Sequence, residues 1–235
     1  MGILRRLLYN IIMSRIISFI PGEYYHLYNR GVNKMIIFND NFDYERFQKL
    51  LYLTNSKETS KLSDINKSSI PVWEEKRGNT LVNIGAYCLM PNHFHLLIKS
   101  KNKEDTARFL QRLQLSYSKY FNSKNSRTGS LFQGKSKAEH IIGENYLKYL
   151  FSYIHLNPIK IIQKDWRDKG IKEINKVKSF LSKYKYSSYN DFIEEKRNVS
   201  KIIEITEFPN YFPNKKIFEK EIFEWLNYNK KYDTK

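Results

Sequence analysis

The chain contains a single cysteine, Cys88, among its 235 residues. An intramolecular disulfide is therefore excluded, and a chain of this length can bury a core without one. Long apolar runs are also missing. In the apolar and basic stretch 1–20, residues Arg5, Arg6 and Arg15 interrupt every run well before the ~20 apolar residues that a spanning helix needs. No small-residue cleavage site follows this stretch.

These absences argue against a membrane protein and against a secreted one. We therefore expect a cytoplasmic protein, and we predict that residues 1–20 form an N-terminal leader. An amphipathic helix on a membrane surface is the alternative for this leader. No internal repeat is found along the chain.

Acidic residues are scarce relative to basic ones. The chain has 24 Asp and Glu against 41 Lys and Arg, which gives a formal net charge of +17. Such a surplus favours a polyanionic partner such as nucleic acid. Aromatic residues make up 15% of the chain, and rings that stack on bases beside cations that bind phosphates are typical of single-strand binding. A genomic bias towards Lys, Asn, Ile and Tyr explains part of this composition, but not the deficit of acids.

The spacing of apolar residues predicts the order of the elements. Strands are predicted at 24–30, 81–90, 93–98 and 138–142. Helices are predicted at 43–55, 105–122 and 144–157. The resulting order β-α-β-β-α-β-α predicts an α+β fold of the ferredoxin-like, RRM-like sandwich type, with an antiparallel sheet and helices on one face.

Polar segments suggest how the chain is divided. The stretch 56–80 is rich in Lys and Ser and is predicted to be a long surface loop or insertion. From about residue 165 the sequence is charged and aromatic, with one possible helix near 218–228. We therefore expect one domain over 21–164, followed by a C-terminal extension over 165–235.

His93 and His95 flank Phe94 on a predicted strand, where alternate residues share a face. Both imidazoles are therefore predicted to point the same way, with Phe94 directed into the core. Two imidazoles on one rigid strand make a partial metal site. From these residues alone, an accidental pair of structural histidines is the alternative. His26 or His140 could also lie near such a site, but a structural role is the favoured interpretation for both.

Tyr153 and Asn157 lie four residues apart on a predicted helix, so they share a face. A tyrosine hydroxyl beside a carboxamide pairs a possible nucleophile with a possible ligand for a hard metal ion. The alternative is that Tyr153, one of 18 tyrosines, fills the core and that Asn157 merely ends the helix before Pro158. His155 lies roughly 200° around the helix from Tyr153 and is predicted to face away.

Four segments together resemble a known family. AYCLMPNHFHLLIK (86–99) resembles the HUH motif of the single-tyrosine, IS200-like transposases. Three more segments resemble the REP-associated tyrosine transposase branch, and they are YHLYNRG (25–31), GSLFQGK (129–135) and YIHLNPIK (153–160). YSSY (186–189) is a weaker match to a motif that often follows. Four matches in the family's order are far more specific than any single one.

The resemblance implies a catalytic tyrosine on a helix, which is Tyr153 in this chain. It implies that His93, His95 and Asn157 bind Mg²⁺ or Mn²⁺, although related transposases often carry Gln at the position of Asn157. It also implies nicking and strand transfer of single-stranded or hairpin DNA through a 5′-phosphotyrosine intermediate. A domesticated DNA-binding protein without transposition, or another HUH nuclease such as a replication initiator or relaxase, is the alternative. The active form is expected to be a monomer or a homodimer.

Arg30, Lys135 and Lys137 are predicted to bind DNA phosphates, and the alternative is that their charges are only solvated. After Gly134 the sequence reads Lys-Ser-Lys, where the resembling family more often has an Arg-Phe pair. The local DNA contacts of this segment are therefore left open. Because the family's C-terminal part is variable, no role beyond residue 165 is carried over from the resemblance.

Overall fold

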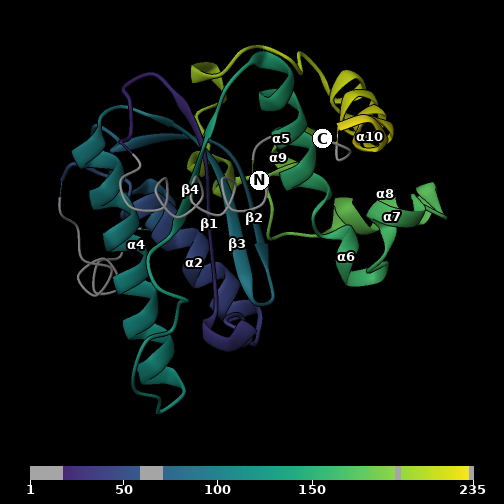
Figure 1. Cartoon of the computed structure of the whole chain (residues 1–235). Coiled ribbons are helices and arrows are strands. Elements are labelled where there is room, and N and C mark those ends of the chain that lie inside the picture. The colour runs from purple at the N-terminus through teal and green to yellow at the C-terminus, as the bar shows by residue number, and fades with distance from the viewer. Residues whose placement is uncertain (1–17, 59–70, 194–196, 233–235) are drawn as a thin grey trace, which may run out of the picture.

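The computed structural model describes residues 18–58, 71–193 and 197–232. Four strands form one antiparallel sheet in the order β2-β3-β1-β4 (Figure 1). The strands are β1 (Tyr24–Arg30), β2 (Val82–Met90), β3 (His93–Ser100) and β4 (Lys137–Ile141). This order, with a βαββαβ succession of elements, is that of the ferredoxin-like fold and confirms the predicted class.

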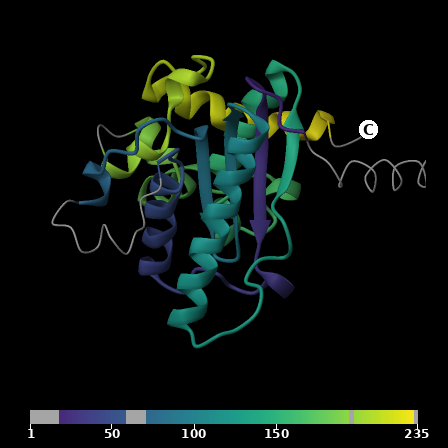
Figure 2. The ribbon, with the colours of Figure 1, turned by 90° about the vertical axis from the view of Figure 1, so that its left-hand side faces the viewer.

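Two long helices cover one face of the sheet. They are α2 (Asn41–Leu53) and α4 (Lys103–Lys124), seen in dark blue and teal in front of the strands in Figure 2. Alternate residues of β3 point to this face and belong to the main core cluster, and they are Phe94, Leu96 and Ile98. The period of two in the strand therefore places the intervening residues, including both histidines of the HUH segment, on the other face.

Helix α5 (Glu144–Leu156) packs on that other face. The prediction placed the helices on one face, and for α5 this is wrong. The second face of the sheet is also apolar, at Ala86, Cys88 and Leu97. An apolar face must be shielded from water by another element, and here that element is α5. Leu150 and Ile154 of α5 belong to the same buried cluster.

The C-terminal residues add further helices, which are α6 (Ile159–Ile162), α7 (Trp166–Lys169), α8 (Ile174–Lys183), α9 (Tyr189–Ile193) and α10 (Lys215–Tyr232). The helix expected near 218–228 is confirmed within α10. Leu156 at the end of α5 shares a buried cluster with Trp166 and Phe218. Leu89 at the β2 edge donates its N–H to the Tyr186 carbonyl at 2.9 Å. The extension is thus packed onto both the sheet edge and α5.

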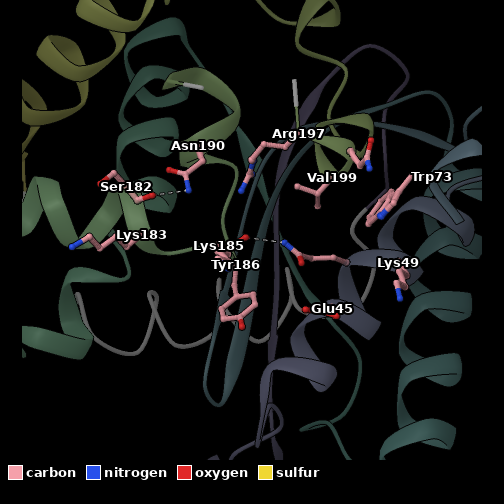
Figure 3. Close-up of a pocket in the computed structure, with 12 residues that line it drawn as sticks. Glu45, Lys49, Trp73, Ser182, Lys183, Lys185, Tyr186, Asn190, Arg197 and Val199 are labelled. Atoms are coloured by element: carbon pink, nitrogen blue, oxygen red, sulfur yellow. Dashed lines mark hydrogen bonds between the residues drawn. The ribbon is translucent and has the colours of Figure 1, made fainter. Parts of the chain in front are cut away.

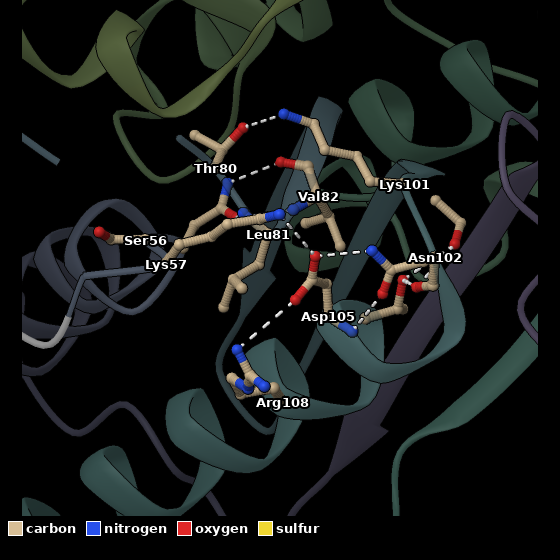
Figure 4. Close-up of polar contacts among 12 residues, drawn as sticks. Ser56, Lys57, Thr80, Leu81, Val82, Lys101, Asn102, Asp105 and Arg108 are labelled. Carbon is tan, nitrogen blue, oxygen red and sulfur yellow. Dashed lines mark hydrogen bonds and ion pairs between the residues drawn. The ribbon is translucent and has the colours of Figure 1, made fainter. Parts of the chain in front are cut away.

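Both described ends of the 56–80 stretch are tied to the beginning of α4 (Figure 4). Asp105, which is 5% exposed, accepts a hydrogen bond from Asn102 at 2.7 Å and pairs with Lys57 at 3.3 Å. Lys101 donates to Thr80 at 2.6 Å. This anchor lies at the Ser100 end of β3, about 23 Å from the His93 end for a rise of ~3.3 Å per residue. The described ends of the 56–80 stretch are therefore attached far from the two histidines.

Two predictions fall partly outside the described residues. They are the 1–20 leader, of which only 18–20 are described, and the surface loop of 56–80, of which 59–70 are not described. Within the described part of the chain, no helix is both long and apolar enough to cross a membrane.

Candidate active site

His93 and His95 lie at the beginning of β3 with their rings on the face that α5 covers. Phe94 between them points the opposite way and packs against Phe47, with ring centroids 5.1 Å apart. His95 is 5% exposed and His93 is partly buried. The alternation predicted from His-Phe-His is therefore what the strand shows.

Tyr153 of α5 lies directly against this strand. Its ring packs edge-on against His95, at 5.3 Å between centroids, and against His26, at 5.7 Å. Tyr149, one turn earlier, has its ring 6.1 Å from that of Tyr153. The structure thus brings Tyr153 to the histidines, although 58 to 60 residues separate them in sequence.

Asn157 ends α5 and is fully buried. Neither its Oδ1 nor its Nδ2 atom has a hydrogen-bond partner, and the buried Nε2 atom of His95 has none either. Buried polar groups in native proteins are almost always paired, because an unpaired one costs about 1–3 kcal/mol. These unpaired atoms therefore mark a place where a ligand is expected.

Both histidines are held in the neutral form. Burial, aided by the positive charge of Lys160, lowers the pKa of His93 to about 4. The Asn157 carboxamide lies close enough to His93 to oppose part of this lowering, although no hydrogen bond of normal geometry joins the two side chains. Burial, followed by the proximity of His26 and His93, lowers the pKa of His95 well below 6.5. Neutral imidazole is the form that binds metal ions.

The tautomer of His93 follows from its neighbour. Its Nδ1 atom lies 2.6 Å from Oδ1 of Asn92, an oxygen that only accepts hydrogen bonds. The proton therefore sits on Nδ1, and Nε2 carries the free lone pair. Within the described residues, no three His, Cys, Asp or Glu side chains converge as a metal site. The carboxamide of Asn157, buried and without a hydrogen-bond partner, lies next to the two histidines.

His26 also belongs to this cluster, although from the sequence it is interpreted as a structural histidine. Its Nε2 atom lies 2.8 Å from Nδ1 of His95, and its Nδ1 atom lies 3.8 Å from a Glu139 oxygen. Alternation along β1 from Tyr24 could have identified it once the pairing of β1 with β3 was known. Tyr28, two residues further on, has its ring 5.8 Å from His95.

The other two histidines behave as predicted. His140 lies on the opposite face, where it stacks on Tyr25 at 5.0 Å and donates to Glu23 at 3.0 Å. His155 is fully buried and points away from Tyr153, with its Nε2 atom 2.8 Å from the Ser188 hydroxyl. Neither side chain takes part in the cluster around Tyr153.

A family model described as "Transposase IS200 like" matches residues 22–157, which is more than half of the chain. The chain belongs to the IS200-like transposase family. A solved structure described as a REP-associated tyrosine transposase bound to a REP hairpin is 13% identical, with a TM-score of 0.44. That similarity covers 75% of this transposase and 82% of the other chain. The comparison with curated protein sequences gave no match.

The three basic residues predicted to bind DNA occupy two different places on this transposase. Arg30 pairs across the sheet with His93, and its Nε atom donates to Gln133. Lys137 pairs with Tyr28 and lies 6.0 Å above that ring, on the same face as His95. Lys135 instead lines a separate cavity of about 830 Å³ between α4 and the segment 129–138. Only Arg30 and Lys137 are therefore near the histidines.

Two further cations near Tyr153 or the two histidines were not predicted. Arg167 of α7 stacks over the Tyr153 ring with its Cζ atom 4.4 Å from the centroid. Lys160 of α6 is close enough to lower the pKa values of His93 and His95. Arg167 lies in the extension, beyond the matched range of the family model and in a segment that has no recognisable pattern of residues.

A second, basic cavity of about 530 Å³ lies where the extension meets α2 (Figure 3). Its lining residues are mostly cationic, aromatic or amide-bearing, and include Lys49, Trp73, Lys183, Lys185, Tyr186 and Arg197. Gln48 of α2 donates to the Lys185 carbonyl at 3.0 Å and so holds the two walls together. The cavity gives this transposase a positive surface outside the Tyr153 cluster.

Proposed function

We propose that this IS200-like transposase nicks and rejoins single-stranded DNA, with Tyr153 as the nucleophile. The observation that carries the proposal is the position of Tyr153 beside the unpaired Nε2 atom of His95 and the unpaired Asn157 carboxamide. A tyrosine that only filled the core would have no need of unpaired ligand atoms next to its ring. The REP-associated branch is proposed from the segments around Tyr25, Gly129 and Tyr153.

The residues present fit a divalent metal ion. His93 and His95 offer neutral imidazole nitrogens, and Asn157 offers an unpaired oxygen. We propose that these three hold Mg²⁺ or Mn²⁺, which accept such ligands together with phosphate oxygens. When bound, the ion would polarise the scissile phosphate and neutralise charge that develops on it.

The chemistry assigned to the chain itself belongs to the Tyr153 hydroxyl. Its oxygen attacks the phosphorus atom and loses its proton, the bond from phosphorus to the 3′ oxygen breaks, and that oxygen takes up a proton. The products are a 5′-phosphotyrosine on the protein and a free 3′-hydroxyl. Rejoining reverses these steps with another 3′-hydroxyl, so the stored ester bond supplies the energy of ligation.

Charge and surface chemistry support DNA as the substrate. The net charge is +17, and the exposed Arg30 and Lys137 lie on the face of the sheet that carries the histidines. Tyr28 on the same face offers a ring for an unpaired base. We propose hairpin-forming single strands as the target, from the segments that resemble the REP-associated branch.

A covalent-adduct assay tests this function. Single-stranded and hairpin oligonucleotides are labelled on the 3′ side of the expected nick, incubated with Mg²⁺ or Mn²⁺, and resolved under denaturing conditions. A labelled band that migrates with the protein and depends on metal is the expected result. DNA binding without any adduct would instead favour the domesticated DNA-binding protein. Cleavage without rejoining would favour another HUH nuclease.

A further inference from the structure

Arg167 is held against Tyr153 by the packing of its own short helix. Trp166, the first residue of α7, is 3% exposed and belongs to the buried cluster that joins α5 to the extension. Figure 1 shows α6 and α7 following the C-terminal end of α5. With Trp166 fixed in this way, the neighbouring guanidinium lies over the Tyr153 ring, 4.4 Å from its centroid. Stacking on this ring fixes the plane of the guanidinium.

One edge of the Arg167 guanidinium has no partner. The Nε and Nη2 atoms are both buried and neither makes a hydrogen bond. These two N–H groups point to the same side of the planar group, and this is an edge that binds two oxygens of a phosphate at once. Charged donors left unpaired in a buried place are costly, and an oxyanion would satisfy both.

Lys160 adds a second positive charge at the same place. It lies on α6, three residues beyond Asn157, and forms no ion pair among the described residues. Burial and then the charge of Arg167 lower the pKa of its ammonium group. Both cations also lower the pKa values of His93 and His95. Two cations that repel each other beside the two histidines are typical of a site that receives an anion.

We propose that Arg167 and Lys160 form a phosphate-binding subsite beside Tyr153, in which the Nε and Nη2 donors of Arg167 bind the oxygens of the phosphate that Tyr153 attacks. This inference rests on the proposed function. Arg167 is then a catalytic residue, because it touches the reacting group. Its charge offsets the negative charge that builds up on the phosphate oxygens during attack, and it goes on holding the same phosphate in the 5′-phosphotyrosine.

Two substitutions separate what the two-donor edge of Arg167 contributes to the rate of adduct formation from what its positive charge contributes. Arg167→Lys keeps the positive charge but loses the planar, two-donor edge, whereas Arg167→Gln loses both. We expect Arg167→Gln to form adduct at least ~100-fold more slowly in single turnover, and Arg167→Lys to restore little of that rate. The affinity for the oligonucleotide should change far less. Lys160→Gln should give a smaller loss, because a single flexible ammonium is replaced.

Lys169→Gln is the matched control. Lys169 lies on the same short helix, but its ammonium pairs with Asp165 at 2.8 Å in solvent. This variant should nick at the wild-type rate. Thermal melting of each variant shows whether α7 has kept its packing, and Lys160→Gln retests the subsite without altering α7. Wild-type rates in both Arg167→Gln and Lys160→Gln would overturn the subsite while leaving the Tyr153 assignment untouched.

A second readout does not depend on nicking. The Nε–H resonance of Arg167, assigned by its loss in Arg167→Lys, is followed by NMR in the Tyr153→Phe protein. It should shift when a single-stranded oligonucleotide is added and should stay in place when an equal concentration of NaCl is added. If the oligonucleotide binds and this resonance does not move, the subsite is refuted whether or not the wild-type protein cuts DNA. Failure of the wild type to form any adduct would count against the proposed function alone.

Discussion

The Nε2 atom of His26 lies 2.8 Å from the Nδ1 atom of His95 on the neighbouring strand. Glu139 on the other side of β1 places a carboxylate oxygen 3.8 Å from Nδ1 of His26, and this interaction lowers the pKa of the Glu139 carboxyl. A carboxylate, a bridging imidazole and a second imidazole thus stand in a row. With the His26 proton on Nδ1, facing Glu139, the Nε2 atom of His26 accepts a hydrogen bond from Nδ1 of His95. The Nε2 lone pair of His95 is then free for a metal ion.

The first prediction concerns this row. His26→Ala removes the group that orients His95, so the affinity for Mn²⁺ should fall by roughly 10- to 100-fold. Titration of the metal-free protein, followed by the electron paramagnetic resonance signal of free Mn²⁺, measures this directly. His140→Ala is the control, because that histidine lies on the opposite face of the same sheet. Equal affinities in the two variants would remove His26 from the site.

The second prediction concerns the proposed ligands. His93→Ala and His95→Ala should each abolish adduct formation, and a chelator should do the same to the wild type. DNA affinity should be largely retained, since it rests on surface cations. Asn157→Gln keeps a carboxamide oxygen and should retain more activity than Asn157→Ala. Full activity of a His95→Ala protein without bound metal would contradict the ligand assignment.

The third prediction concerns pH and uses a histidine outside the site. Burial lowers the pKa of His155 from 6.5 to about 3. The unfolded chain therefore takes up a proton near pH 6.5 that the folded protein refuses until about pH 3. The stabilising contribution is complete above the unfolded pKa and declines by up to about 1.4 kcal/mol per pH unit as the pH falls through this window.

Urea denaturation of the metal-free protein at several pH values in this window tests the sign. The free energy of unfolding should decrease as the pH is lowered. The His155→Gln protein should show a shallower decrease, because the group that titrates only on unfolding is gone. A wild-type stability that rises towards acid pH would contradict the buried neutral state of His155.

The fourth prediction concerns the basic cavity beside α2. Lys183 and Lys185 are exposed on its rim, so they should bind phosphates of the strand without touching the reaction. Replacing both with Gln should weaken single-strand binding and lower the slope of log affinity against log salt by roughly 0.7 per lost contact. Lys220→Gln on α10 is the control for a change of charge alone. An unchanged salt slope would place the DNA elsewhere.

How much of this site can be predicted from the sequence depends on how far apart in the sequence the contacting residues lie. The alternation of His93 and His95 follows from the period of a strand, and the shared face of Tyr153 and Asn157 follows from the period of a helix, so both are local. The role of His26 depends on the register of β1 against β3, which brings it within hydrogen-bond distance of His95, 69 positions away in the sequence. That register is set by packing across the whole sheet, so no local pattern in the segment 25–31 shows it.

The same argument applies to α5 and to Arg167. The apolar stripe of α5 was predicted, but which face of the sheet it covers depends on Ala86 and Leu97, whose burial appears only in the folded sheet. Arg167 meets Tyr153 because Trp166 packs into a cluster with residues as distant as Phe218. A short helix positioned by such contacts leaves no periodicity in its own sequence.

The last prediction is that Tyr153, and not a neighbouring tyrosine, forms the covalent bond. Two rivals are close. Tyr28 has its ring 5.8 Å from His95, and Tyr149 has its ring 6.1 Å from Tyr153. Burial and the nearby charge of Glu139 raise the pKa of Tyr28, so its hydroxyl gives up its proton less readily. Tyr149 lies one turn further from Asn157, and so from the unpaired atoms that mark the site.

Tyr153→Phe removes only the hydroxyl oxygen and keeps the ring that packs against His95, so folding and DNA binding should persist while the adduct disappears. Tyr28→Phe and Tyr149→Phe are the matched controls and should still form it. Peptide mapping of the wild-type adduct by mass spectrometry then identifies the modified residue independently. Phosphotyrosine found at position 28 or 149, or adduct undiminished in Tyr153→Phe, would move the nucleophile to another element. In that event the unpaired atoms of His95 and Asn157 would need a different explanation, because Tyr153 would then only pack against them.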